Sequence, residues 1–339
     1  MFTRISSLIA FSIFLCVSSQ VSAADFDLTY YRGEIGQGNH VLLELTNFAG
    51  KLSGSYIYVK RQIPIDLAGT LGEDGAFGLT ETVDTKETGR FTGKLLEDGK
   101  KLEGTWTDSE GKSSTPFSLA RFAKQKLEEK KGDFDGGTIE SSFAYPVFEG
   151  PSEAPLNEAI VRHVTRSNEA FVDEISKATD PSVQVDNMYD VDMDVTVYTP
   201  GQFVSLVSTT YVFTGGAHGM TQYSTLNLRL SPQGAPAPVK LSDMFTSQEQ
   251  ALAKLSELCI ADLKKQKAGF VVDGMVDSLD WEVLSHFSLS PAGILFLFEP
   301  YAVAPYAEGT FDVLIPFDAL TGVLKPDALQ GIVPPLPKG

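Results

Sequence analysis

The chain has 339 residues, a mean hydropathy of −0.02 and a formal net charge of −17 at pH 7. An acidic surface repels nucleic acid and anionic lipid, so the charge argues against a nucleic-acid-binding protein and favours cationic partners. The two cysteines, Cys16 and Cys259, are too few for a disulfide framework.

The first 23 residues have the three parts of a secretory signal peptide. Arg4 supplies the positive charge, residues 8–17 are almost wholly apolar, and Val21-Ser22-Ala23 offers a small–any–small cleavage pattern. We therefore expect the mature chain to begin at Ala24. No later apolar run approaches the ~20 residues that a membrane helix needs, so we expect a soluble protein without a membrane span. A mature chain with one cysteine suits the periplasm of a Gram-negative bacterium.

Residues 24–122 repeat a short phrase that reads apolar, any, glycine, polar, apolar. Period-two alternation marks strands, and a glycine inside a strand marks a bend or a close backbone approach. Turn signals separate the copies, and no helical stretch interrupts them. We predict an antiparallel β-meander that closes into a small barrel. The repeated glycines are Gly33, Gly54, Gly69, Gly93 and Gly104.

Residues 123–134 are rich in lysine and glutamate and cannot bury an apolar face of their own. They predict a charged linker between two domains. Residues 24–122 carry 15 acidic and 11 basic side chains, whereas residues 133–339 carry 27 and 11, so the acidity belongs to the second domain.

Residues 135–339 predict an α+β domain with an antiparallel sheet and two main helices. An apolar stripe from Leu156 to Ile175 indicates one helix, and a capping pattern at Thr246-Ser247-Gln248-Glu249 opens another. The expected strands span residues 189–197, 203–213, 223–230, 294–298 and 310–315.

A glycine-rich loop contains the residues Gly215, Gly216, His218 and Gly219. Glycines permit positive φ and expose neighbouring amides, so the loop could cradle an anion or hold His218 as a base. A turn that joins two strands needs no ligand, and both interpretations remain open.

Asp190, Asp192 and Asp194 alternate along one expected strand and therefore share a face, about 7 Å apart. Their carboxylates diverge, which is unlike a calcium loop. We interpret them as a solvated acidic stripe that could contact a cationic protein.

A second candidate contact is the loop at residues 298–309, which repeats a Pro-Tyr pair. Prolines order the backbone in advance, and tyrosines present rigid amphipathic area at low entropic cost. The predicted contacts are Glu299, Pro300, Tyr301, Pro305 and Tyr306. Alternatively, both tyrosines pack inward and the loop is a wide connection.

Common catalytic motifs are absent, including HExxH, Gly-x-Ser-x-Gly, the phosphate-binding loop and a cysteine pair for zinc. We expect no cofactor, no metal and no enzymatic activity. A Ser–His–Asp arrangement around His218 remains an alternative, because its members need not be neighbours in sequence.

The phrase from Tyr211 to Gly219 reads Tyr-Val-Phe-Thr-Gly-Gly-Ala-His-Gly. With residues 144–148, 241–245 and 298–309, it resembles the periplasmic domain shared by RsiV-type anti-sigma factors and PdaC-type peptidoglycan deacetylases. The resemblance implies an envelope-associated binding domain, because the sensor members of this family bind lysozyme. We see neither a sigma-binding segment nor the zinc motif of the deacetylase domain. The first region looks broadly similar to avidin- or lipocalin-like barrels.

These observations predict a soluble periplasmic binding protein. Its expected partner is a cationic protein such as lysozyme, or a peptidoglycan fragment. Two alternatives are a cell-wall hydrolase or esterase that uses His218, and an envelope factor whose barrel captures a small apolar ligand.

Overall fold

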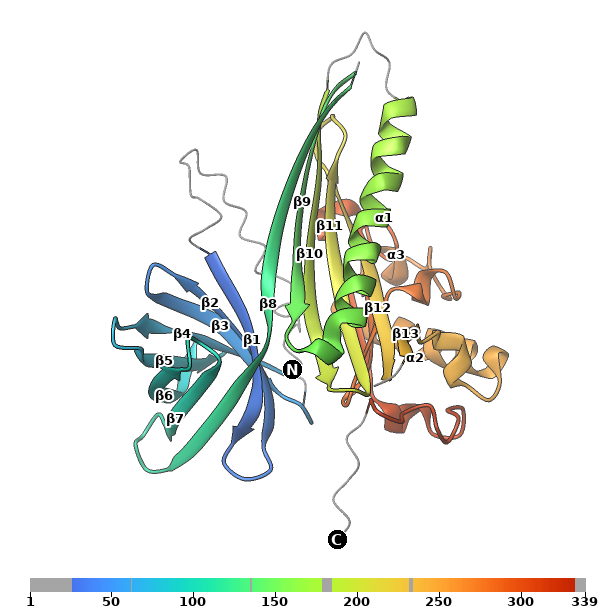
Figure 1. The fold of residues 1–339 in the computed structure, drawn as a ribbon. Coiled ribbons are helices and arrows are strands. Elements are labelled where there is room, and N and C mark those ends of the chain that lie inside the picture. The colour runs from blue at the N-terminus through green and yellow to red at the C-terminus, as the bar shows by residue number, and fades with distance from the viewer. Residues whose placement is uncertain (1–25, 62, 135, 179–184, 232–233, 333–339) are drawn as a thin grey trace. The chain divides into compact units, whose positions relative to one another are not determined.

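The computed structural model describes residues 26–332, except residues 62, 135, 179–184 and 232–233 (Figure 1). The expected signal peptide at residues 1–23 lies outside the described residues. The chain divides into two compact units, Met1–Lys126 with Pro146–Glu153, and Leu127–Tyr145 with Ala154–Gly339. Of the helices in the described part of the chain, none combines the length and hydropathy of a membrane-spanning segment.

The first unit is a closed antiparallel barrel, as the sequence predicts. Each strand pairs with the next, and β1 pairs with β8 to complete the circle. The strands are β1 (Phe26–Ile35), β2 (His40–Phe48), β3 (Lys51–Tyr58), β4 (Pro64–Leu71), β5 (Ala76–Val83), β6 (Lys86–Leu96), β7 (Lys101–Asp108) and β8 (Ser114–Phe134).

Aromatic and aliphatic side chains fill much of the barrel interior. The ring centroid of Phe91 lies 5.2 Å from that of Phe117 and 5.6 Å from that of Tyr56, both with edge contacts. One carboxylate is buried with them, because Glu81 is only 4% exposed. It accepts hydrogen bonds from Tyr56 Oη at 2.6 Å, Thr88 Oγ1 at 2.6 Å and Trp106 Nε1 at 2.7 Å.

The repeated glycines lie where neighbouring backbones approach closely. A Cβ at each would fall about 2 Å from a carbonyl oxygen of the adjacent strand, a distance that no side chain tolerates. The expected close approach is confirmed at Gly33, Gly54, Gly69, Gly93 and Gly104.

We expect Gly69→Ala to lower the free energy of unfolding by about 1–3 kcal/mol, because its Cβ would lie 1.8 Å from the carbonyl oxygen of Gly78 and the two strands would have to separate. Gly78→Ala is the matched control, since a Cβ there meets nothing within 4 Å. Urea denaturation of the two variants measures the difference. Equal stabilities would contradict this account of the repeat.

The second unit is built on a mixed sheet. Its strands are β9 (Gly137–Phe148), β10 (Val185–Thr199), β11 (Phe203–Phe213), β12 (Met220–Ser231) and β13 (Gly234–Pro238). The expected α+β class is confirmed, with one difference in the sheet. β9 and β10 are parallel, because α1 (Ala154–Ala178) connects them as a crossover.

Helix α1 covers one face of this sheet (Figure 1). Its stripe is buried at Leu156, Ile160 and Val164, and the ring of Phe171 lies 4.8 Å from that of Tyr189 on β10. The sequence therefore predicted both the position and the buried face of this helix.

The opposite face carries a small sheet of β14 (Phe287–Ser290), β15 (Gly293–Phe298) and β16 (Phe311–Ile315). A buried polar contact joins the layers, where Ser205 of β11 lies within 2.8 Å of both Asn227 and Ser288. Helix α2 (Gln248–Gln266) packs with this sheet and is capped by Ser247, whose hydroxyl accepts a hydrogen bond from the amide of Gln250. The remaining short helices are α3 (Gly269–Val272), η2 (Pro151–Glu153), η3 (Leu241–Met244), η4 (Val283–Ser285), η5 (Tyr306–Glu308) and η6 (Phe317–Leu320).

The expected charged linker at residues 123–134 is wrong, because these residues are the second half of β8. The strand is held by backbone pairing to β9, which does not require an apolar face. Its side chains form cross-strand contacts instead. Lys131 pairs with Glu140 at 2.6 Å, and Glu128 accepts from Tyr145 Oη at 2.8 Å.

Candidate functional site

Three aromatic side chains from two distant segments meet in the second unit. The imidazole of His218 stacks on the ring of Tyr306, with centroids 3.9 Å apart and planes inclined by 19°. Tyr301 lies beside Tyr306, with centroids 5.8 Å apart. We call His218, Tyr301 and Tyr306 the aromatic surface. The structure thus brings the glycine-rich loop and the Pro-Tyr loop together.

The carbonyl oxygen of Gly219 connects the two loops. It accepts a hydrogen bond from Tyr306 Oη at 2.8 Å and lies 3.0 Å from His218 Nδ1. A Cβ at Gly219 would fall 2.4 Å from Cζ of Tyr211, so only glycine fits against that ring. Gly215 and Gly216 have φ of +88° and +94° and form the turn that precedes His218.

Tyr301 is presented to solvent by a strained backbone. Its φ is +71°, in the left-handed region, and its side chain is 52% exposed. This conformation costs a bulky residue about 1–2 kcal/mol. Burial does not explain it, since half of the side chain is exposed. Strain of this kind persists where the surrounding structure holds it, often at binding sites. Here the Tyr301 amide donates to the carbonyl of Ala304 at 3.1 Å.

Two of the other predicted loop contacts support the loop from within. Glu299 Oε1 accepts from the backbone amide of Tyr223 at 2.7 Å and lies 3.6 Å from His286 Nδ1. Pro300 is buried, so its prediction as a partner contact is wrong: a partner cannot reach a proline whose surface is covered by its own chain. Pro305 is half-buried next to Tyr306.

The three aspartates lie on the sheet face opposite α1, in alternation along β10. They are half-buried, so the expected solvated stripe is wrong. β10 is a central strand flanked by β9 and β11, and Ser142 Oγ donates to Asp190 at 3.1 Å. Burial raises the pKa of Asp190. As partner contacts, Asp190, Asp192 and Asp194 stay a prediction.

The two segments that form the aromatic surface carry no lysine or arginine. Residues 178–228 and residues 268–324 contain aspartate and glutamate as their only charged side chains apart from histidine. Several of these carboxylates are exposed, among them Asp273, Asp277 and Glu308. The aromatic surface therefore belongs to strongly acidic segments of the chain.

The hydrolase alternative gains no support at His218. Its ring stacks on Tyr306 and its Nδ1 faces a backbone carbonyl. Within the described residues, neither a serine hydroxyl nor a carboxylate is hydrogen-bonded to it.

A cleft of about 440 Å³ between α1 and strands β10–β12 was missed by the sequence analysis. His163 Nε2 lies 3.1 Å from Ser224 Oγ at its edge. Burial lowers the pKa of His163, so the ring is neutral at pH 7. Ser208 Oγ is buried in the lining and has no hydrogen-bond partner among the described residues. The cleft can therefore hydrogen-bond to a polar ligand.

No motif could have revealed this cleft. Its polar members, which include Thr210 and Gln222, come from four elements that are adjacent only after folding. In sequence, His163 reads as one polar position on an amphipathic helix.

Comparison with known proteins finds family matches in the region that carries the aromatic surface. Residues 134–221 match the family described as deacetylase PdaC, and residues 242–318 match a protein family of unknown function, DUF3298. The C-terminal region therefore matches the PdaC and DUF3298 family models over most of its length. The resemblance noted in the sequence is confirmed.

Among curated proteins, the chain is similar to the peptidoglycan-N-acetylmuramic acid deacetylase PdaC of Bacillus subtilis, with 28% identity over 56% of this chain and 40% of that protein. It is also similar to the immunogenic protein MPT64 of Mycobacterium tuberculosis, with 21% identity over 59% of this chain and 89% of that protein. The chain thus spans less than half the length of the Bacillus relative.

Two solved structures of DUF3298 proteins align with 61% of the chain. One, from Pseudomonas aeruginosa, has a TM-score of 0.46 and 19% identity over 94% of its own length. The other, from Bacteroides fragilis, has a TM-score of 0.44 and 21% identity over 95%.

The expectation of a protein without enzymatic activity is overturned by the comparison with PdaC, because that relative is named as a deacetylase. The expectation rested on the lack of short catalytic motifs. Such motifs identify only those enzymes whose catalytic residues are close in sequence.

Proposed function

We propose that the second unit is a cell-envelope recognition domain whose aromatic surface binds a cationic protein such as lysozyme. The observation that carries the proposal is Tyr301, which is exposed on a strained backbone and supported by Tyr306 and His218. Tyrosine is enriched among residues that dominate binding energy at protein interfaces.

Charge supports a cationic partner over a peptidoglycan fragment. Residues 133–339 carry a net charge of −16, and neither segment of the aromatic surface contains a lysine or arginine. Complementary charge accelerates encounter and contributes affinity that salt screens. A wall fragment has carboxylates of its own and would be repelled by this surface.

The test is titration of the chain with a cationic lysozyme at low and high salt. We expect binding that weakens as salt rises. Tyr301→Gly should reduce affinity about tenfold or more, because it removes the exposed ring. The same variant should keep the thermal stability of the parent, since glycine adopts positive φ without strain.

Val161→Ala is the matched control, because Val161 is an exposed apolar residue on α1, 41% exposed and outside the aromatic surface. It should leave lysozyme affinity unchanged. An affinity for lysozyme that is unchanged by Tyr301→Gly would refute the role of the aromatic surface. Absence of lysozyme binding, with Tyr301-dependent binding of a muropeptide, would replace the cationic protein with a wall fragment.

A further inference from the structure

The barrel of the first unit has a cavity of about 350 Å³ at one end. Its lining is mixed: Leu45, Leu52, Phe77 and Leu102 supply apolar surface, and the charged side chains are Asp27, Asp74, Asp98, Arg121 and Lys124. Small-molecule sites are usually concave, mostly apolar and about 300–1,000 Å³, with a few polar groups that orient the ligand. The volume of this cavity lies in that range, and its lining combines apolar side chains with charged groups that can orient a ligand.

The opposite end of the barrel is closed. Glu81, Tyr56 and Trp106 hydrogen-bond there, near the turn between β5 and β6. The cavity residues lie instead near the turns between β4 and β5 and between β6 and β7. The interior is therefore a cup with one mouth.

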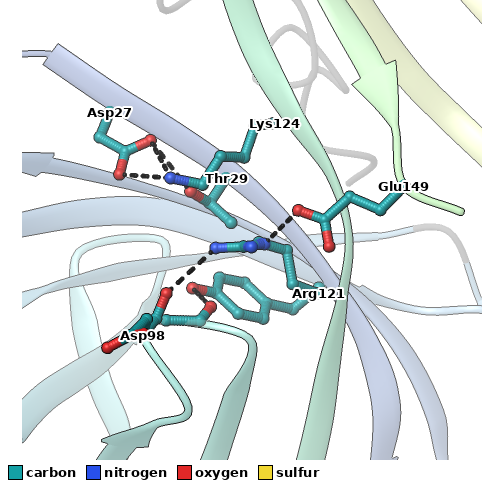
Figure 2. A network of polar contacts seen from close by, with 8 residues as sticks. Asp27, Thr29, Asp98, Arg121, Lys124 and Glu149 are labelled. Atoms are coloured by element: carbon teal, nitrogen blue, oxygen red, sulfur yellow. Dashed lines mark hydrogen bonds and ion pairs between the residues drawn. The ribbon is translucent and has the colours of Figure 1, made fainter. Parts of the chain in front are cut away.

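One of the charged groups at the mouth is the guanidinium of Arg121 (Figure 2), whose side chain is only 9% exposed. Nη1 donates to the carbonyl oxygen of Asp98 at 3.3 Å, and Nε lies 2.6 Å from Glu149 Oε1. The Glu149 contact lacks hydrogen-bond geometry, so the buried Nε has no hydrogen-bond acceptor among the described residues.

A buried guanidinium carries five N–H donors, and leaving them without acceptors costs free energy. Carboxylates satisfy such a fork with two parallel hydrogen bonds. Glu149 shows that a carboxylate can approach this guanidinium, although it neutralises part of the charge. The second cation at the mouth, Lys124, is occupied by Asp27, with contacts of 3.1 and 3.3 Å (Figure 2).

We propose that the mouth of the barrel binds a small amphiphilic carboxylate, with its apolar chain inside the cup and its head group on Arg121. The walls supply apolar contact and the guanidinium selects a charged head over a neutral one. Glu149 competes with the ligand for the same group. This site lies wholly in the first unit and is independent of the lysozyme proposal.

The test compares octanoate with octanamide, which share a chain and differ in head-group charge. Calorimetry with the full chain should show octanoate binding at least tenfold more tightly. Arg121→Gln should lower octanoate affinity about tenfold and leave octanamide unchanged, which also shows that the cavity is intact. Glu149→Gln should tighten octanoate binding several-fold, because it removes the competing carboxylate.

Arg90→Gln is the matched control. Its guanidinium pairs with Glu87 on the outside of the same barrel and does not line the cavity, so octanoate affinity should not change. Equal affinities for the two ligands, or no octanoate binding by the parent chain, would overturn the proposal. If Arg121→Gln fails to fold, two measurements still test the proposal. They are the head-group preference of the parent chain and the direction in which Glu149→Gln changes octanoate affinity.

Discussion

Replacing Glu81 with alanine is expected to lower the free energy of unfolding of the barrel by about 3–5 kcal/mol. The substitution leaves three donors without their acceptor, on Tyr56, Thr88 and Trp106. Each unsatisfied buried donor costs about 1–3 kcal/mol, with the lower values for groups that water can reach. Only the Tyr56 bond is fully buried, so the total stays below the sum of three maximal penalties.

Urea denaturation followed by Trp106 fluorescence measures this loss. The chain has two tryptophans, and Trp281→Phe removes the signal of the second unit. Glu110→Ala is the control, since Glu110 is an exposed acid on a turn of the same barrel, where its ion pair is with the equally exposed Lys112. A loss below about 1 kcal/mol for Glu81→Ala would show that the three donors find other acceptors.

The second unit should become less stable as pH rises from about 4 to 6, because of Asp312. Burial, together with the nearby Asp262 carboxylate as the smaller cause, raises the pKa of this carboxyl from 3.8 to about 6. The folded chain then binds the proton more tightly than the unfolded chain. Ionisation therefore favours unfolding, and the lost stability amounts to about 3 kcal/mol above pH 6.

Asp312→Asn should flatten this pH dependence and stabilise the second unit at pH 7. Denaturation midpoints from pH 3.5 to 7.5, followed by Trp281 fluorescence in a Trp106→Phe background, measure both effects. Asp318→Asn is the control, because Asp318 is an exposed acid three residues beyond β16 and contacts no other carboxylate among the described residues. A variant that retains the slope of the parent would assign the dependence to other groups.

Local patterns predicted most of the secondary structure, because each carries its own physical signature. The glycine repeat identified the barrel, since only glycine permits the close approach of neighbouring backbones. The stripe from Leu156 to Phe171 identified α1, and the capping pattern that opens at Thr246 placed the start of α2 to within one residue of its N-cap, Ser247. Residues 203–213 match β11 at both ends.

The predictions were wrong where a neighbouring strand, and not the local sequence pattern, decides the structure. Residues 123–134 have no apolar face, yet β9 supplies the backbone hydrogen bonds that make them a strand. Asp190 alternates like an exposed residue, but its strand is central, and burial then raises its pKa. The local sequence of a strand does not show which other strands will flank it in the sheet.

By itself, the sequence determined the barrel, the α+β domain, the acidic character of the second region and the two loops that carry His218, Tyr301 and Tyr306. Only the tertiary structure decided that these loops share the carbonyl of Gly219, that Tyr301 is exposed at positive φ, and that Arg121 faces a cavity. Composition and periodicity are local properties of the chain. The contacts at each site join residues tens of positions apart, and packing of the whole fold decides them.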